Sequence, residues 1–280
     1  MRLSALIRAL EADVAPQEAR YIIKQRTGLG WGACIARPET ILPETVLAQI
    51  ADDLRALKGG MPLSRLYGVR AFWGRDFRLS PETLDPRIDT ETLVSRVLAS
   101  FKDQNAPLKV LDLGTGSGCL LLTLLCEFPQ AVGVGIDLSE GALRTARENA
   151  KALGVTERAG FVCGDWAESV QAPFDLVVSN PPYIVRSVIP SLADSVRNYD
   201  PILALDGGED GLAAYEILFA QLPRLLKKHG RAFFEIGADQ GKTVPRLSAD
   251  SGVFDSALCL DSAGLPRVVE IFFTQQNGDK

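Results

Sequence analysis

The chain has 280 residues, of which 46% are hydrophobic and 23% are charged, as is typical of globular proteins. Its formal net charge is −5, with 30 basic residues against 35 acidic ones, so no stable nucleic-acid binding is expected, because general binders neutralise phosphates. Five scattered cysteines without a Cys-x-x-Cys pair indicate a reducing compartment, and a single histidine excludes a histidine-rich metal site.

Residues 1–65 are predicted to form a small helical domain. Leu3, Leu6, Ile7 and Leu10 recur at the spacing of one helix face. A second helix is predicted from Pro16 to near Gly28, and a third over residues 43–57, which end before two glycines. No apolar stretch approaches the roughly 20 residues that a membrane-spanning helix needs. We therefore expect a cytoplasmic protein without a membrane partner.

Residues 66–85 change in character. Gly68 and Gly74 interrupt a series of β-forming side chains, which are Tyr67, Val69, Phe72, Trp73, Phe77 and Leu79. This pattern predicts a β-hairpin that links two domains. The alternative is an irregular linker rich in aromatic residues.

Residues 86–280 alternate between helical and extended patterns. Strands are predicted over residues 109–113, 131–137, 160–163, 174–179 and 231–236, and helices over residues 90–101, 118–128, 139–153 and 211–228. This alternation predicts an α/β fold with a mostly parallel sheet covered by helices on both faces. Two final strands, residues 254–260 and 267–274, follow one another without a helix. They are expected to form an antiparallel hairpin that closes one edge of the sheet.

The single histidine, His229, follows Lys227 and Lys228 at the end of the predicted helix over residues 211–228. Positive charge is favoured at a helix C-terminus. We therefore interpret His229 as a helix-terminal residue rather than a catalytic one, which disfavours a serine triad.

A glycine loop follows the strand predicted over residues 109–113. It consists of Gly114, Thr115, Gly116, Ser117 and Gly118. A side chain at any of the three glycines would forbid the turn or keep a ligand away from the backbone. The dinucleotide fingerprint has a third glycine where this chain has Cys119, so the spacing favours the form found in methyltransferases.

Polar side chains also end the next two strands. Asp137 is predicted to accept hydrogen bonds from ribose hydroxyls, and the alternative is a carboxylate that caps the helix after Ser139. Asp165 and Trp166 end the third strand and are predicted to reach an adenine, the carboxylate at its amine and the indole at its face. The alternative for Trp166 is ordinary packing on the sheet edge.

The tetrapeptide Asn180, Pro181, Pro182 and Tyr183 follows the strand predicted over residues 174–179. The Asn180 side-chain carbonyl can accept one N–H of a planar amino group, and the Pro181 backbone carbonyl can accept the second. The prolines hold these acceptors in place, and Tyr183 offers an aromatic face to a sulfonium cation. The motif therefore predicts methyl transfer to an amide or exocyclic amine nitrogen. Most of the rate would come from holding this nitrogen in line with the methyl group. The alternative is a simple turn.

Together these motifs resemble the HemK/PrmC family of protein-(glutamine-N5) methyltransferases. Further matches lie at residues 86–91, 204–212 and 234–237. The resemblance implies a class I S-adenosylmethionine-dependent methyltransferase, Rossmann-like with a seven-stranded sheet, and a helical domain that recognises the substrate. Such enzymes methylate the glutamine N5 of the Gly-Gly-Gln motif in class I peptide chain release factors. By the resemblance, residues 114–118, Asp137, Trp166 and Asn180 contact S-adenosylmethionine, and residues 180–183 hold the glutamine amide.

The chain departs from the family segment at two positions. Ile88 stands where the family has proline, and Asp85 stands where it has an aliphatic residue. Three alternatives remain. An adenine-N6 nucleic-acid methyltransferase would share the acceptor chemistry but should carry a basic recognition region. A non-catalytic module should show losses in the glycine loop or at Asn180, and a dinucleotide oxidoreductase is disfavoured by Cys119.

Overall fold

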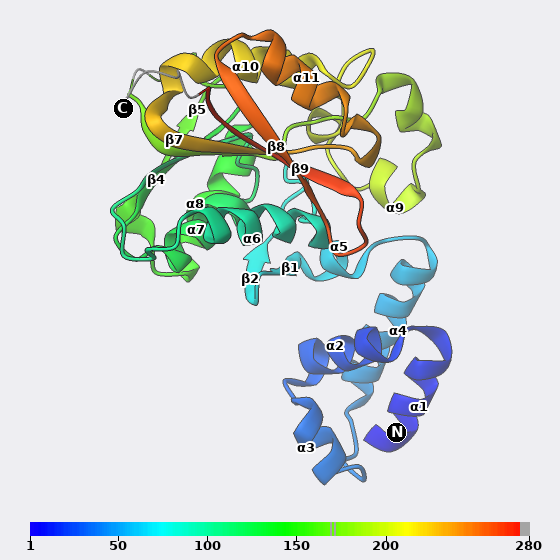
Figure 1. Cartoon of the computed structure of the whole chain (residues 1–280). Helices are drawn as coiled ribbons and strands as arrows, with labels where there is room; N and C mark the ends of the chain where they lie inside the picture. The colour runs from blue at the N-terminus through cyan, green and yellow to red at the C-terminus, as the bar shows by residue number, and fades with distance from the viewer. Residues whose placement is uncertain (169, 171, 275–280) are drawn as a thin grey trace. The chain divides into compact units, whose positions relative to one another are not determined.

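The computed structural model describes residues 1–168, 170 and 172–274. The chain divides into two compact units, Met1–Gly68 and Val69–Lys280 (Figure 1). Within the described ranges, none of the helices has both the length and the apolar character needed to cross a bilayer.

The first unit is a bundle of helices around its own core. Its elements are α1 (Leu3–Asp13), α2 (Pro16–Thr27), α3 (Trp31–Ala36), α4 (Glu44–Lys58) and α5 (Leu63–Tyr67). The three predicted helices are confirmed as α1, α2 and α4, and α2 ends at Gly28 in the left-handed conformation with φ of 71°. The helices α3 and α5 were not predicted, because 6 and 5 residues are too few to show a period.

A buried carboxylate joins three helices of this bundle. Asp53 of α4 is 2% exposed and accepts hydrogen bonds from Arg26 of α2 and Tyr67 of α5, both at 2.7 Å. Burial acts to raise the pKa of Asp53, but these hydrogen bonds and the Arg26 charge outweigh it and leave the pKa below its ordinary value. Because the pKa of Asp53 is lower in the folded than in the unfolded state, its ionised carboxylate stabilises the bundle at pH values above the unfolded-state pKa. This stabilisation is lost as the pH falls through the folded-state pKa.

The predicted hairpin is confirmed in a shorter form. Its strands, β1 (Val69–Phe72) and β2 (Arg75–Arg78), pair antiparallel, whereas residues 66 and 67 belong to α5. Trp73 and Gly74 form the turn with φ of 51° and 69°, the left-handed pair that a two-residue hairpin favours. The Trp73 backbone N–H donates to Glu91 at 2.7 Å and its indole donates to Glu127 at 3.2 Å. The hairpin is therefore part of the second unit.

The second unit contains the predicted mostly parallel sheet with seven strands in the order β5-β4-β3-β6-β7-β9-β8. Strands β3 to β7 run parallel, and β9 runs antiparallel to both of its neighbours, which confirms the antiparallel hairpin at one edge. The bounds are β3 (Lys109–Leu113), β4 (Val132–Asp137), β5 (Ala159–Cys163), β6 (Phe174–Ser179), β7 (Leu226–Glu235), β8 (Phe254–Leu260) and β9 (Pro266–Phe273).

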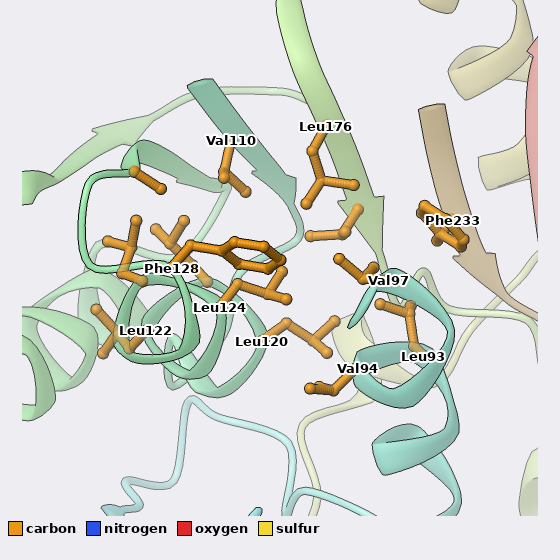
Figure 2. Packing of buried hydrophobic residues seen from close by; sticks show 14 of the residues in the cluster. Leu93, Val94, Val97, Val110, Leu120, Leu122, Leu124, Phe128, Leu176 and Phe233 are labelled. Atoms are coloured by element: carbon orange, nitrogen blue, oxygen red, sulfur yellow. The ribbon is translucent and has the colours of Figure 1, made fainter. Parts of the chain in front are cut away.

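Helices cover both faces of this sheet (Figure 1). One face carries α6 (Glu91–Ser100), α7 (Cys119–Glu127) and α8 (Glu140–Ala152), and the other carries α10 (Ala213–Leu225) and α11 (Thr243–Asp250). Alternate residues of β6 serve opposite faces: Leu176 packs with Leu120 and Phe128 beneath α7 (Figure 2), whereas Val177 belongs to the α10 core. The short elements are α9 (Asp194–Arg197), η1 (Ile88–Thr90), η2 (Thr156–Arg158), η3 (Arg186–Ser191), η4 (Ile202–Ala204) and η5 (Ala238–Gln240).

The prediction for His229 is wrong. The helix α10 ends at Leu225, and His229 lies exposed in β7. Leu226 already pairs with Phe174 of β6, and a register shift separates this contact from the regular pairing that resumes at Arg231. Pairing with the sheet thus overrides the helical continuation that the local sequence favours. The helix α11 was also missed.

Two glycines of β4 bring the neighbouring elements close to the sheet. A Cβ at Gly133 would lie 2.5 Å from Leu121 Cδ1, and a Cβ at Gly135 would lie 2.8 Å from Thr115 Oγ1. Such distances are shorter than van der Waals contact. Only glycine at these two positions therefore allows α7 and the loop after β3 to pack directly against β4.

Replacing Gly135 with alanine should therefore destabilise the second unit. Thr115 cannot swing aside, because its hydroxyl donates to the buried Asp112 at 2.7 Å. We expect Gly135→Ala to lower the free energy of unfolding by about 1–3 kcal/mol, the usual cost of overpacking, in chemical denaturation. Gly160→Ala on β5 is the matched control, because its Cβ would meet nothing nearer than 3.7 Å. Equal stability of the two variants would contradict this account of the packing.

Candidate active site

The candidate site lies where the order of the sheet reverses. The chain moves from β3 outward to β4 and β5, then returns to the other side of β3 as β6. Leu113 pairs with Ser179, so both strands end at the same level and the following loops leave the sheet side by side. Ligands of open α/β sheets bind at such switch points.

A cavity of about 240 Å³ opens at this point and lies entirely within the second unit. Nearly all of the predicted cofactor residues line it. The described lining residues are Glu82, Leu84, Pro86, Thr90, Gly114, Thr115, Gly116, Ser117, Cys119, Leu120, Ile136, Asp137, Leu138, Gly164, Asp165, Trp166, Asn180, Pro182, Pro201, Leu203 and Ala204.

The glycine loop forms one wall of the cavity. Its backbone is pinned to β4, because the N–H groups of Gly114 and Thr115 both donate to the Ile136 carbonyl at 2.9 Å. Gly114, Gly116 and Gly118 have φ of 72°, 55° and 79°, a region that side chains disfavour. Gly118 does not line the cavity. It instead lets the loop enter α7, because a Cβ there would lie 2.9 Å from Leu122 Cδ1.

Asp112 holds this loop from behind. It is 1% exposed and accepts hydrogen bonds from the Thr115 hydroxyl at 2.7 Å and the Leu121 N–H at 3.3 Å. Burial raises the pKa of the Asp112 carboxyl to about 7, although both hydrogen bonds oppose the shift. Asp112 thus orients the loop without entering the cavity.

Asp137 combines the two roles weighed for it from the sequence. Its oxygens accept the backbone N–H of Gly116 at 2.8 Å and that of Ser139 at 2.9 Å, and the side chain also lines the cavity. Each carboxylate oxygen has a second lone pair, so a ribose hydroxyl can still be accepted. Burial raises the pKa of Asp137, and the backbone hydrogen bonds oppose this effect.

Asp165 and Trp166 also line the cavity and follow the end of β5. Trp166 has φ of 48°, an uncommon conformation for a bulky residue, while its side chain packs against the core beneath α10. Strain of this kind is concentrated at ligand sites. Trp166 therefore keeps an unfavourable backbone conformation while its side chain lies at the cavity wall.

The acceptor motif divides between the cavity and its surroundings. Asn180 and Pro182 line the cavity, whereas Pro181 is buried and is not among the lining residues. The Asn180 Nδ2 donates to the Thr90 hydroxyl oxygen at 3.3 Å. Tyr183 does not line this cavity, and its hydroxyl instead donates to Glu235 at 3.4 Å.

The chain from Leu84 to Thr90 provides a wall whose individual residues were given no role from the sequence. Leu84, Pro86 and Thr90 line the cavity, and Asp200 secures the segment by accepting the Asp85 N–H at 3.1 Å and the Arg87 guanidinium at 2.5 Å. Ile88 is 72% exposed, so its replacement of proline disturbs no packing. Asp85 is buried and lies 3.6 Å from Arg70, so the departure from an aliphatic residue is matched by a cation.

Thr90 and Glu235 are among the residues around the site that sequence reasoning left without a role. Glu235 ends β7 and is 1% exposed. The signal was an acidic residue directly after an apolar strand, in Ala232-Phe233-Phe234-Glu235. Thr90 belongs to the family match over residues 86–91, but nothing local indicated its contact with Asn180, which joins residues 90 positions apart.

The charges of the cavity test which ligand fits. Glu82, Asp137 and Asp165 are the charged side chains among the described lining residues. Three carboxylates repel the phosphates of a dinucleotide, and they suit a ligand that bears a sulfonium cation and ribose hydroxyls. The glycine loop, the acids and the indole therefore fit S-adenosylmethionine.

Comparisons with known proteins agree with this geometry. The family described as "Methyltransferase small domain" matches residues 87–194. A release factor glutamine methyltransferase of Bradyrhizobium diazoefficiens is 43% identical over 270 residues, covering 95% of this chain and 91% of its own. One from Rhodospirillum rubrum is 44% identical over 252 residues, covering 90% and 77%. A methyltransferase structure from Pyrococcus furiosus shares the fold, with a TM-score of 0.53 at 19% identity over 72% of this chain and 90% of that one.

The match to these relatives extends over nearly the whole chain, including the helical unit. It therefore identifies more than the α/β fold, which many methyltransferases share. The acidic cavity, the glycine loop and the Asn180 motif are all within the matched length. The chain belongs to the release factor glutamine methyltransferases, a family of enzymes whose methyl donor is S-adenosylmethionine.

Proposed function

We propose that this enzyme methylates the side-chain amide nitrogen, N5, of the glutamine in the Gly-Gly-Gln motif of class I peptide chain release factors. The observation that carries the proposal is the Asn180 amide at the cavity wall. Its Nδ2 is engaged by Thr90 at 3.3 Å, which leaves its Oδ1 to accept an N–H from a substrate amide. The relatives' printed name supports release factors as the substrate.

The cofactor roles proposed for the cavity follow from its chemistry. S-adenosylmethionine, when bound, supplies an electrophilic methyl group on a sulfonium. Residues 114–117 would let it approach the backbone closely, Gly118 would shape the loop from outside the cavity, and Asp137 would accept hydrogen bonds from the ribose. Asp165 and Trp166 would hold the adenine at its amine and its face.

The acceptor roles address the weak nucleophilicity of an amide nitrogen, whose lone pair is delocalised. Asn180 Oδ1 and the Pro181 carbonyl would each accept one N–H of the glutamine. Two fixed acceptors orient the nitrogen toward the methyl group, and alignment of this kind supplies much of the rate of an in-line transfer.

A side-by-side methylation assay tests the substrate. The full chain would be given S-adenosylmethionine with a radiolabelled methyl group together with a class I release factor, DNA or tRNA. We expect label in the release factor, and none after its Gly-Gly-Gln glutamine is replaced by alanine. Label that appears in a nucleic acid and not in the release factor would favour the adenine-N6 alternative instead.

Asn180→Ala should abolish transfer while leaving the fold intact. The change removes the acceptor that orients the substrate amide, so we expect kcat to fall by at least about a hundredfold, with a normal melting temperature. Asn105→Ala, in an exposed turn before β3, serves as the matched control and should keep wild-type turnover. Near-normal kcat in Asn180→Ala would remove this residue from the mechanism.

We also propose that the helical domain, residues 1–65, recognises the protein substrate, that residues 66–85 link it to the rest, and that residues 86–280 carry out methyl transfer. An independent helical core, in a compact unit that extends to Gly68, supports a separate helical domain. Removing residues 1–65 should raise KM for the release factor far more than it weakens S-adenosylmethionine binding, measured by calorimetry. Equal losses would indicate that the helices serve only stability.

A further inference from the structure

A single buried carboxylate ties together two walls of the cavity. The Asp200 side chain is 1% exposed, and its two oxygens accept from different groups. Oδ1 accepts the backbone N–H of Asp85 at 3.1 Å, and Oδ2 accepts the Arg87 guanidinium at 2.5 Å. The walls that meet here line the cavity with Leu84, Pro86 and Thr90 on one side and with Pro201, Leu203 and Ala204 on the other. Both walls consist of loop and 3₁₀-helix, so their positions depend on contacts of this kind.

The first wall leads directly to the acceptor motif. Arg87 precedes η1, in which the Thr90 N–H donates to the Arg87 carbonyl at 3.1 Å. Thr90 is 1% exposed, and its hydroxyl oxygen accepts from Asn180 Nδ2 at 3.3 Å. A displacement of Arg87 would therefore be passed through a single helical turn to the side chain that is proposed to orient the substrate amide.

The second wall reaches the same motif from its other end. Pro201 follows Asp200 directly, and its ring restricts the backbone of both residues. Beyond η4, the Leu205 carbonyl accepts from the Ile184 N–H at 3.0 Å, and the Ile184 carbonyl accepts from the Gly207 N–H at 2.8 Å. Ile184 is the residue that follows the acceptor motif, so the motif is held at both of its ends.

We propose that Asp200 is a positioning residue that closes a ring of hydrogen-bonded segments and thereby fixes Asn180 relative to the methyl donor. One half of the ring runs from Asp200 through Arg87 and Thr90 to Asn180. The other half runs from Ile184 through η4 back to Asp200. This inference rests on the proposed function, because it takes Asn180 as the group that orients the substrate amide. It adds the residue on which that placement depends.

The pair of Asp200 with Arg87 contributes geometry more than stability. Removing a carboxylate from water is costly, and the attraction to its partner does little more than offset that cost. Two separate acceptor oxygens, however, hold the backbone of residue 85 and the guanidinium of Arg87 at a fixed spacing. Methyl transfer depends on such spacing, because a shift of about 1 Å near the reacting groups can lower the rate about a hundredfold.

The decisive variant is Asp200→Asn, studied in the full-length enzyme with its release factor and S-adenosylmethionine. Asparagine keeps the shape but has one acceptor oxygen, so it cannot serve both the Asp85 N–H and the Arg87 guanidinium. With both substrates saturating, we expect kcat to fall by about tenfold to a hundredfold, while KM for the release factor changes little.

Glu270→Gln is the matched control. Glu270 is a buried carboxylate of β9 that is not among the described lining residues, and its partner Arg231 is 41% exposed, against 39% for Arg87. Both variants should lower the melting temperature to a similar extent, but Glu270→Gln should keep wild-type kcat. If Asp200 served stability alone, both variants would keep wild-type kcat well below their melting temperatures.

A double-mutant cycle tests the ring itself. Thr90→Val removes the hydroxyl that accepts from Asn180 and so opens the ring at a second point. Once a closed ring has been opened, opening it elsewhere should cost little more. We therefore expect Asp200→Asn to lower kcat much less in the Thr90→Val background than in the wild-type enzyme. Losses that multiply in full would show that the two residues act independently, and the ring would be rejected.

The Asn180 side-chain amide reports its own position without turnover. Its ¹⁵N–¹H signals, assigned by their absence in Asn180→Ala, would be recorded in the enzyme with S-adenosylmethionine and no release factor. We expect these signals to shift or broaden in Asp200→Asn and to remain unchanged in Glu270→Gln. Unchanged signals in Asp200→Asn would contradict the positioning role.

The outcomes separate this inference from the proposed function. Wild-type kcat in Asp200→Asn would overturn the positioning role even if the release factor is the substrate. If the label enters a nucleic acid instead, the proposed substrate fails. The same variants are then compared on that amino group, where losses of kcat that do not multiply still support the ring.

Discussion

The site depends on the parallel pairing of β3 with β6. Leu113 and Ser179 lie opposite one another, and the Ser179 hydroxyl donates to the Leu113 carbonyl at 2.6 Å. The next residue on each strand is Gly114 or Asn180, so the donor loop and the acceptor motif leave the sheet at the same level. Because β3 and β6 lie at the centre of the sheet, apolar clusters on both faces hold this juxtaposition, and Figure 2 shows part of the one beneath α7.

Two buried carboxylates support the cavity from behind. Asp112 orients the glycine loop through Thr115, and Glu235 contacts the acceptor motif through the Tyr183 hydroxyl. Burying such groups is costly, and burial raises the pKa of each to about 7. The cost indicates that the precise placement of these loops matters more here than the stability that an apolar residue would add.

The wall segment from Leu84 to Thr90 explains how this chain accommodates two departures from its family. Asp200 holds the segment mainly through the Asp85 backbone and the Arg87 side chain, neither of which needs proline at position 88 or an aliphatic residue at position 85. Arg267 adds a contact with Asp89 at 3.3 Å. Ion pairs and backbone contacts can thus secure a cavity wall whose local sequence has changed.

The alternation of helix and strand patterns was sufficient to predict the α/β fold, the hairpin over β1 and β2, and the antiparallel edge, because each rests on local periodicity. The motifs likewise located the glycine loop and Asn180 at strand ends, where the cavity lies. The strand that contains His229, the wall after Leu84, and the hydrogen bonds of Asn180 with Thr90 and of Tyr183 with Glu235 were decided by the tertiary structure. Each depends on contacts between residues distant in sequence, such as Thr90 with Asn180 or Phe174 with Leu226, and local patterns carry no record of these contacts.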